Sequence, residues 1–140
     1  MKMEMTGMRI LVLEDEYLIG LDLERIAEES GAQSVQLIAT VGELQAQIAN
    51  NTDYDLAILE VQARGVSSLD SAAEMQRRGL PIVFTTAYDS QANGVPGFPD
   101  IPVVAKPYGK AQILQAVAKA LATSKRNSAS RRNGASGEFV

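Results

Sequence analysis

The sequence predicts an α/β fold with a doubly wound parallel sheet, and two observations support this fold class. Two aliphatic runs, Met8–Leu13 and Asp55–Val61, lack the alternation of half-exposed strands and are typical of strands covered on both faces. Strand-like runs also alternate with segments of helical apolar spacing five times along the chain. Such units predict a five-stranded parallel sheet with helices on both faces.

The composition limits the chemistry that this chain can perform. Its 140 residues fit one domain, and a hydrophobic content of 46% is enough for a core. The absence of Cys and His excludes disulfides, thiol nucleophiles, Ser-His-Asp triads and a phosphohistidine. The net charge of −4 gives no reason to expect DNA as a partner of the domain. Without a membrane-length apolar stretch or a signal-peptide pattern, we expect a cytoplasmic protein with no membrane association.

Three strands are expected in the first half of the chain, at Met8–Leu13, Ser34–Ala39 and Asp55–Val61. The mixed character of the second strand fits the edge of a sheet. Between the first two strands, apolar residues recur at helical spacing and predict a helix. Thr40 caps the next helix, and Glu43 completes a capping box three residues later.

The second half of the chain predicts a helix at Ser68–Arg78 and strands at Leu80–Thr86 and Ile101–Ala105. Between these strands, Asp89–Asp100 contains two prolines and two glycines, which argue for a long loop with at most one helical turn. The last helix has an apolar stripe formed by Ile113, Leu114, Val117, Ala118 and Leu121.

The composition changes at Ser124, where apolar periodicity ends and bases outnumber acids by four to one. We therefore predict one domain at residues 1–123 and a basic, disordered tail at residues 124–140. The tail has two interpretations, a solvated end or an arm that binds a partner.

Polar side chains are predicted to meet at one edge of the sheet. Right-handed crossovers place the carboxyl ends of all parallel strands at the same edge, and these ends carry Glu14, Asp15, Glu60, Thr86 and Lys106. Clustered carboxylates repel each other unless a cation compensates their charge. Either Mg²⁺, which prefers oxygen ligands, or the ammonium group of Lys106 can provide this compensation.

Four segments in this order resemble the signature of bacterial response-regulator receiver domains. They are the acid-pair strand Ile10–Glu16, the phosphoacceptor strand Asp55–Val61, the hydroxyl switch Thr86-Ala87 and the lysine-proline-aromatic segment Lys106–Tyr108. The resemblance covers residues 8 to 122 and implies the flavodoxin-like receiver fold, with strand order 2-1-3-4-5. The segment from Phe84 to Tyr88 further resembles a receiver subgroup of stress and light signalling, with Ala87 in place of a glycine.

The resemblance also assigns roles to residues. It makes Glu14 and Asp15 the acids for Mg²⁺, together with the side chain at position 60 and the backbone carbonyl of Gln62. Thr86 becomes the hydroxyl that contacts a phosphoryl group. Lys106 becomes the cation that pairs with the phosphoacceptor.

Two residues depart from the family pattern. Glu60 stands where the family has the aspartate that is phosphorylated, and its extra methylene moves the carboxylate by about 1.5 Å. Phosphoryl transfer depends on positioning at this scale, so we expect Glu60 not to be phosphorylated in the usual way. Val103 replaces an aromatic residue, so the usual coupling between hydroxyl and aromatic side chain is not expected.

Structural interpretations stand beside these roles. The adjacent acids also fit a solvated helix start, and Thr86 also fits a residue that only satisfies nearby backbone groups. Tyr88 and Tyr108 are either packing residues or partner contacts, with packing favoured for Tyr108.

The preferred function is a stand-alone signalling module of a two-component phosphorelay, without enzymatic turnover, in which Glu60 pairs with Lys106 and both groups are charged. Its partners would be signalling proteins, namely a histidine kinase, a phosphotransfer protein or an output protein, and a homodimer is a further candidate. The alternative is a Mg²⁺-dependent phosphoacceptor that catalyses its own phosphoryl transfer from a histidine kinase or a small phosphodonor. A Mg²⁺-dependent hydrolase is a more distant alternative.

Overall fold

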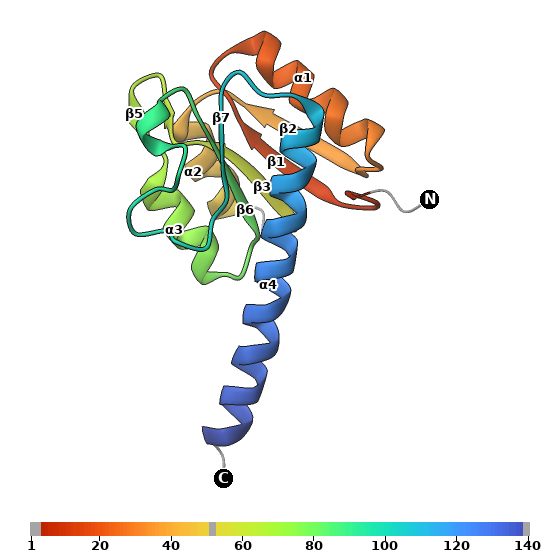
Figure 1. The fold of residues 1–140 in the computed structure, drawn as a ribbon, viewed down its shortest axis with the longest axis vertical. Coiled ribbons are helices and arrows are strands. Elements are labelled where there is room, and N and C mark those ends of the chain that lie inside the picture. Colours follow the sequence, from red (N-terminus) through yellow and green to blue (C-terminus); the bar gives the residue numbers. More distant parts are fainter. Residues whose placement is uncertain (1–3, 51–52, 139–140) are drawn as a thin grey trace.

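The computed structural model describes residues 4–50 and 53–138, and a five-stranded parallel sheet lies at its centre (Figure 1). The spatial order is β2-β1-β3-β6-β7, which confirms the predicted order 2-1-3-4-5. The strands are β1 (Arg9–Leu13), β2 (Ser34–Ile38), β3 (Leu56–Glu60), β6 (Ile82–Thr86) and β7 (Val103–Ala105).

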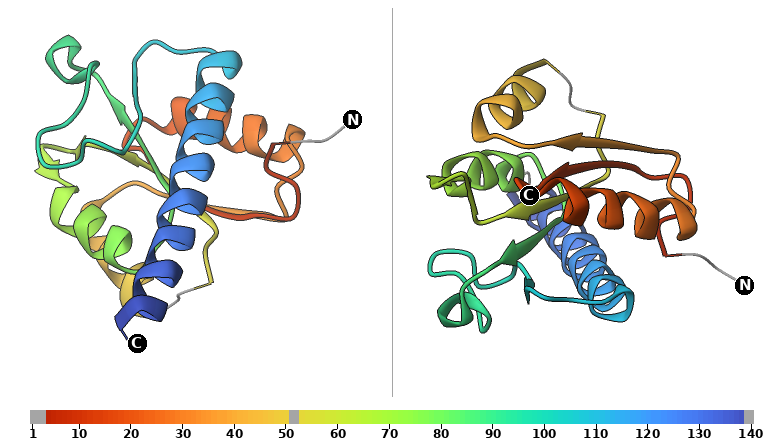
Figure 2. Two further views of the ribbon diagram at one scale, coloured as in Figure 1. Left: turned by 60° about the horizontal axis from the view of Figure 1, so that its bottom comes forward. Right: turned by 90° about the horizontal axis from the view of Figure 1, so that it is seen from above.

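Two helices cover each face of the sheet, as Figure 2 shows. They are α1 (Tyr17–Glu29) and α4 (Lys110–Glu138) on one face, and α2 (Val41–Asn50) and α3 (Leu69–Arg77) on the other. The two faces bury separate hydrophobic clusters. In α1, Gly20 lies close to β2: a Cβ there would lie 2.9 Å from Cδ1 of Leu37, so the Leu37 side chain would have to shift to admit one.

Strand β3 contributes to both clusters and is buried along its whole length. Ala57 and Leu59 pack in the cluster under α2 and α3, whereas Leu56 and Ile58 pack in the cluster under α1 and α4. This alternation follows from the two-residue period of a strand, and it confirms the interpretation of the aliphatic run. Glu60, the last residue of β3, is thereby carried to the carboxyl edge of the sheet.

The capping box at the start of α2 is present. The backbone N–H of Glu43 donates to Oγ1 of Thr40 over 3.1 Å, and Oε1 of Glu43 accepts from the N–H of Ala39 over 3.4 Å. The Thr40 side chain thus satisfies a backbone donor of the first turn, and the Glu43 side chain reaches back to the N–H of the residue before Thr40.

A small hairpin after β3 was not predicted. It consists of β4 (Gln62–Ala63) and β5 (Val66–Ser67), which pair in antiparallel fashion. Its two turn residues, Arg64 and Gly65, both have positive φ angles, of 52° and 76°. This geometry matches the two-residue turns typical of hairpins.

The segment between β6 and β7 has the predicted loop with a single helical turn, the 3₁₀ helix η1 (Asp89–Gln91). The loop nevertheless belongs to the core, because Val95, Phe98 and Ile101 are buried in the cluster under α2 and α3. The ring of Phe98 meets the ring of Phe84 edge-on, with centroids 5.5 Å apart.

The last helix is longer than its apolar stripe. Helix α4 continues past Ser124 to Glu138 and projects beyond the sheet (Figure 1). The segment contains no proline, so a helix nucleated on the sheet can propagate through it. The division of the chain into a domain and a tail at residue 123 stays a prediction. Within residues 4–50 and 53–138, no helix combines the length and apolar character that a bilayer crossing requires.

Candidate functional site at the carboxyl edge of the sheet

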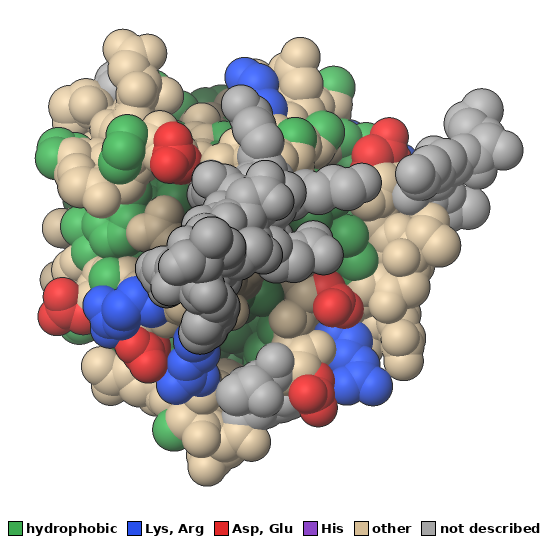
Figure 3. Space-filling model, turned by 90° about the horizontal axis from the view of Figure 1, so that it is seen from below, with side chains coloured by type: hydrophobic (Ala, Val, Ile, Leu, Met, Phe, Trp, Pro, Cys, Tyr) green, Lys and Arg blue, Asp and Glu red, His purple; other side chains and the backbone are tan. Residues whose placement is uncertain are grey.

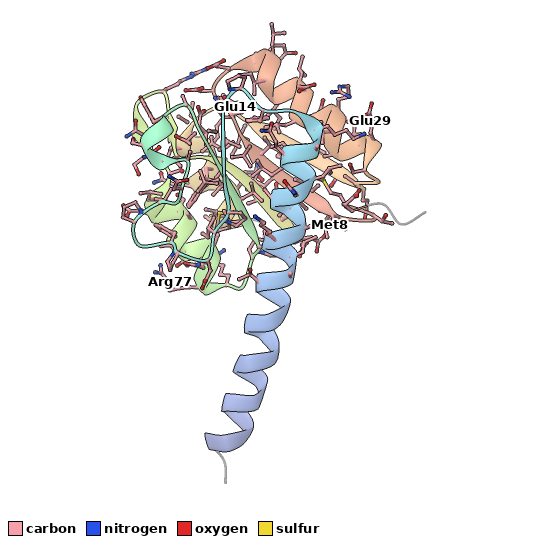
Figure 4. The ribbon with its side chains drawn as sticks, viewed as in Figure 1. Met8, Glu14, Glu29 and Arg77 are labelled. Carbon is pink, nitrogen blue, oxygen red and sulfur yellow. The ribbon has the colours of Figure 1, made fainter. Side chains whose placement is uncertain are left out.

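The predicted acids meet at the carboxyl edge because β1 and β3 are neighbours in the sheet. Glu14 directly follows β1, and Figure 4 shows it at the end of that strand opposite to Met8. The side chain of Glu14 is fully buried, and that of Glu60 is only 6% exposed. Two buried carboxylates in one site require a nearby cation or a proton.

Lys106 supplies the cation. It directly follows β7, and its N–H donates to the backbone oxygen of Thr86 over 2.8 Å, which ties its main chain to the end of β6. Its ammonium nitrogen lies 2.8 Å from Oε2 of Glu14 and 2.8 Å from Oε2 of Glu60. The predicted pair between Glu60 and Lys106 is therefore present, and Glu14 shares the same ammonium group.

Burial is the main reason that the pKa of Glu60 is raised, to about 7; the hydrogen bond from Lys106 opposes the rise and the negative charge of Glu14 adds to it. That both groups of the pair are charged at neutral pH stays a prediction for Glu60. The pKa of Lys106 is lowered by its burial, but its hydrogen bonds to Glu14 and Glu60 more than reverse this and keep it charged.

Asp15 is the more exposed acid of the site. Its burial raises its pKa, but hydrogen bonds, chiefly from the N–H of Arg64 over 2.7 Å, bring the pKa below the usual value. The N–H of Asp15 in turn donates to Oε1 of Glu60 over 3.1 Å. Asp15 thus stays charged, and Glu60 accepts hydrogen bonds on both of its oxygens.

The donor set fits a hard divalent cation. Carboxylate oxygens of Glu14, Asp15 and Glu60 lie within 4.8 Å of one another. Oε1 of Glu14 is buried and has no hydrogen-bond partner within the part of the chain that the structure describes. A pocket of about 160 Å³ lies at the acids, and Gln62 lines it together with Asp15 and Glu60. All four residues of the predicted Mg²⁺ site are therefore close together.

Thr86 lines the same pocket, but its hydroxyl hydrogen bonds are local. Oγ1 of Thr86 donates to Oε1 of Gln91 over 2.6 Å and accepts from the N–H of Tyr88 over 3.0 Å. Val103 pairs with Phe84 and packs against the core, so the position holds no ring that could rotate. Tyr108 packs against the cluster under α1 and α4, whereas Tyr88 is 54% exposed.

Two features of the site were missed in the sequence. The backbone N–H of Arg64 that fixes Asp15 comes from the unpredicted hairpin, for which Arg64-Gly65 after a strand was the available signal. Gln91 gave no signal, because a glutamine in a loop has no pattern that identifies its partner.

Charge is distributed differently at the two ends of the molecule. Near the carboxyl edge, Glu16 adds a further acid, with Oε1 3.8 Å from the ammonium nitrogen of Lys106. Figure 3 views the opposite end, where acidic and basic side chains are interspersed with hydrophobic ones.

Comparisons with known proteins are consistent with this geometry. No protein-family model matches the chain. The phyllosphere-induced regulator PhyR of Methylorubrum extorquens is 30% identical over 118 residues, which are 80% of this chain and 43% of PhyR. The chain spans about half the length of the curated relatives it matches.

Two solved structures match over nearly their whole length. SdrG of Sphingomonas melonis Fr1 has 30% identity and a TM-score of 0.67, and the match covers 84% of this chain and 98% of SdrG. The response regulator TrrA of Thermotoga maritima, solved in complex with Mg²⁺ and BeF, has 25% identity and a TM-score of 0.69. The match covers 81% of this chain and 98% of TrrA.

The chain belongs to the response-regulator receiver family. Receiver domains are signalling modules of two-component systems, and the predicted family and flavodoxin-like fold are confirmed. In this receiver domain the position after Leu59, at the end of the central strand, holds Glu60. The roles of the individual site residues stay predictions.

Proposed function

We propose that this receiver domain signals without phosphorylation of the usual kind, with Glu60 as an unphosphorylated acid at the phosphoacceptor position. One observation carries the proposal. Both oxygens of Glu60 already accept hydrogen bonds from groups of the site, from the N–H of Asp15 over 3.1 Å and from the ammonium of Lys106 over 2.8 Å. The contact between acceptor position and lysine thus exists without an added group.

The same contacts disfavour phosphoryl transfer to Glu60. In such a transfer a carboxylate oxygen attacks the phosphorus atom of the donor in line with the leaving group. Each oxygen of Glu60 is held by a partly buried hydrogen bond, which lowers its nucleophilicity in such an attack. A pKa of about 7 also leaves part of the molecules with a protonated, non-nucleophilic Glu60 at neutral pH.

For Mg²⁺, we propose the ligand set Glu14, Asp15 and Glu60 with the backbone carbonyl of Gln62. The single positive charge of Lys106 does not neutralise all of the acids. A bound Mg²⁺ would compensate the remaining negative charge and would attract phosphoryl oxygens. The low pKa of Asp15 favours this role, because Asp15 needs no deprotonation before it can act as a ligand.

We also propose that the signal leaves through contacts with other signalling proteins in the cytoplasm, namely a histidine kinase, a phosphotransfer protein or an output protein. In this function the domain performs no catalytic turnover. The alternative function, a phosphoacceptor that uses Mg²⁺ to catalyse its own phosphorylation, is favoured by the clustered acid oxygens.

Intact mass after incubation with acetyl phosphate and Mg²⁺ separates the two functions. We expect one added phosphoryl group on Glu60→Asp and none on the unmodified protein, because the shorter acid restores the family's acceptor. Glu60→Gln is the matched control, since it keeps the length of Glu60 without a nucleophilic oxygen. Labelling of the unmodified protein at residue 60 to the same extent as Glu60→Asp would refute the proposal.

A further inference from the structure

The only proton of the Thr86 hydroxyl is already donated in a hydrogen bond. A threonine hydroxyl carries one proton, and this proton is donated to Oε1 of Gln91 over 2.6 Å. The hydroxyl oxygen also accepts from the N–H of Tyr88 over 3.0 Å. Thr86 is 1% exposed, so water does not readily replace either partner.

Gln91 is held at this place by its own backbone. It is the last residue of η1, and its N–H donates to the backbone oxygen of Tyr88 over 3.1 Å. The backbone bond closes the turn of η1, and the side-chain bond from Thr86 ties this turn to the end of β6.

Thr86 nevertheless lines the pocket that contains Asp15 and Glu60. An anion that enters this pocket can receive the proton of Thr86 only if the bond to Gln91 breaks first, because the single proton cannot serve both acceptors.

We infer that Gln91 is a positioning residue, which holds the Thr86 hydroxyl in one orientation and withholds its proton from oxygen anions in the pocket. Loss of this bond also removes the side-chain tie between η1 and the sheet. Occupation of the pocket is thereby coupled to the loop that follows, which enters the core through Val95 and Phe98.

Hydrogen exchange at the amide of Tyr88 tests the positioning in the unmodified site. Gln91→Met keeps the approximate size of the side chain but removes the accepting oxygen, so the Thr86 side chain becomes free to rotate about χ1 and to move Oγ1 away from the amide of Tyr88. We expect the Tyr88 amide to exchange about fivefold faster in this variant, as for the loss of one ordinary hydrogen bond. Gln91→Glu retains an accepting oxygen and should restore slow exchange. Ser90→Ala, an exposed position on the same turn, should leave the exchange unchanged.

An unchanged exchange rate in Gln91→Met would overturn the inference. So would equal acceleration in Gln91→Met and Gln91→Glu, because the accepting oxygen would then be irrelevant. This arm needs no phosphoryl transfer, so its outcome is independent of the proposed function.

A second arm uses the proposed function directly. In the Glu60→Asp background, the ratio of labelled to unlabelled protein after acetyl phosphate treatment should rise about fivefold with Gln91→Met, because the Thr86 proton becomes available to the phosphoryl group. Gln91→Glu should give no rise. If Glu60→Asp itself accepts no label, the proposed function fails, while the exchange experiment still decides the role of Gln91.

Discussion

Replacing Lys106 by methionine tests most directly whether its ammonium group compensates the buried carboxylates of Glu14 and Glu60. The change keeps an unbranched apolar stem and removes the ammonium group that lies 2.8 Å from both Glu14 and Glu60. The two carboxylates are 0% and 6% exposed, so water cannot take over the role of the lysine. Removing one partner of a buried charge pair typically costs about 3–5 kcal/mol of unfolding free energy, and we expect a loss in this range at pH 7.5.

The chain contains a matched control in Lys110. Its ammonium nitrogen lies 2.9 Å from Oε1 of Glu29, almost the same separation, but these side chains are 44% and 45% exposed. Solvent screening limits such a surface pair to about 0–1 kcal/mol. Lys110→Met should therefore cost little, although it removes the same charge at the same distance.

The loss caused by Lys106→Met should depend on pH. Without the ammonium group, whose hydrogen bond lowers the pKa of Glu60, this already raised pKa rises further above its value in the unfolded chain. An acid with a raised pKa contributes its stability fully below the unfolded pKa and loses it as the pH rises through the folded pKa. The penalty should therefore be small near pH 5 and largest above pH 7.

Urea unfolding followed by far-UV circular dichroism measures these differences in the unmodified protein and both variants. Equal losses for Lys106→Met and Lys110→Met at pH 7.5 would contradict the reasoning. A penalty for Lys106→Met that grows as the pH falls would contradict it as well.

Three further predictions concern the site and its support. Because the pKa of Glu60 is raised from 4.5 to about 7, stability should fall by about 3 kcal/mol as the pH rises through this interval, and Glu60→Gln should remove most of that slope in urea titrations. Mg²⁺ at ten times its dissociation constant should stabilise the protein by about 1.4 kcal/mol, and thermal unfolding of Asp15→Asn should show a much smaller shift. Phe98→Ala should cost about 3 kcal/mol in urea unfolding, because it removes a buried ring packed on Phe84, whereas a loss below about 1 kcal/mol would show that the loop is not part of the core.

The sequence was most informative about backbone placement. Strand β3 could be predicted because its aliphatic run reflects burial on both faces, and the position of Glu60 follows from where that run ends. The convergence of Glu14, Glu60 and Lys106 follows in turn from the parallel topology, in which all carboxyl ends share one edge.

Hydrogen-bond partners could not be predicted in the same way. Whether Lys106 serves Glu60 alone or also Glu14 depends on side-chain geometry in the folded protein. The raised pKa of Glu60 depends in turn mainly on the burial of its side chain. The orientation of the Thr86 hydroxyl depends on Gln91, whose place is set by one turn of 3₁₀ helix. Such choices arise from tertiary packing, which sequence patterns do not encode.

The burial of β3 on both faces restricts how the site can change. The main chain at Glu60 is anchored in two independent cores, so moving it would disturb the packing of both helix layers at once. The hairpin at Arg64 and the turn at Gln91 have no such double anchorage. The end of β3 is thus a fixed reference point, and a conformational response to a ligand or a partner has to take place in the segments around it.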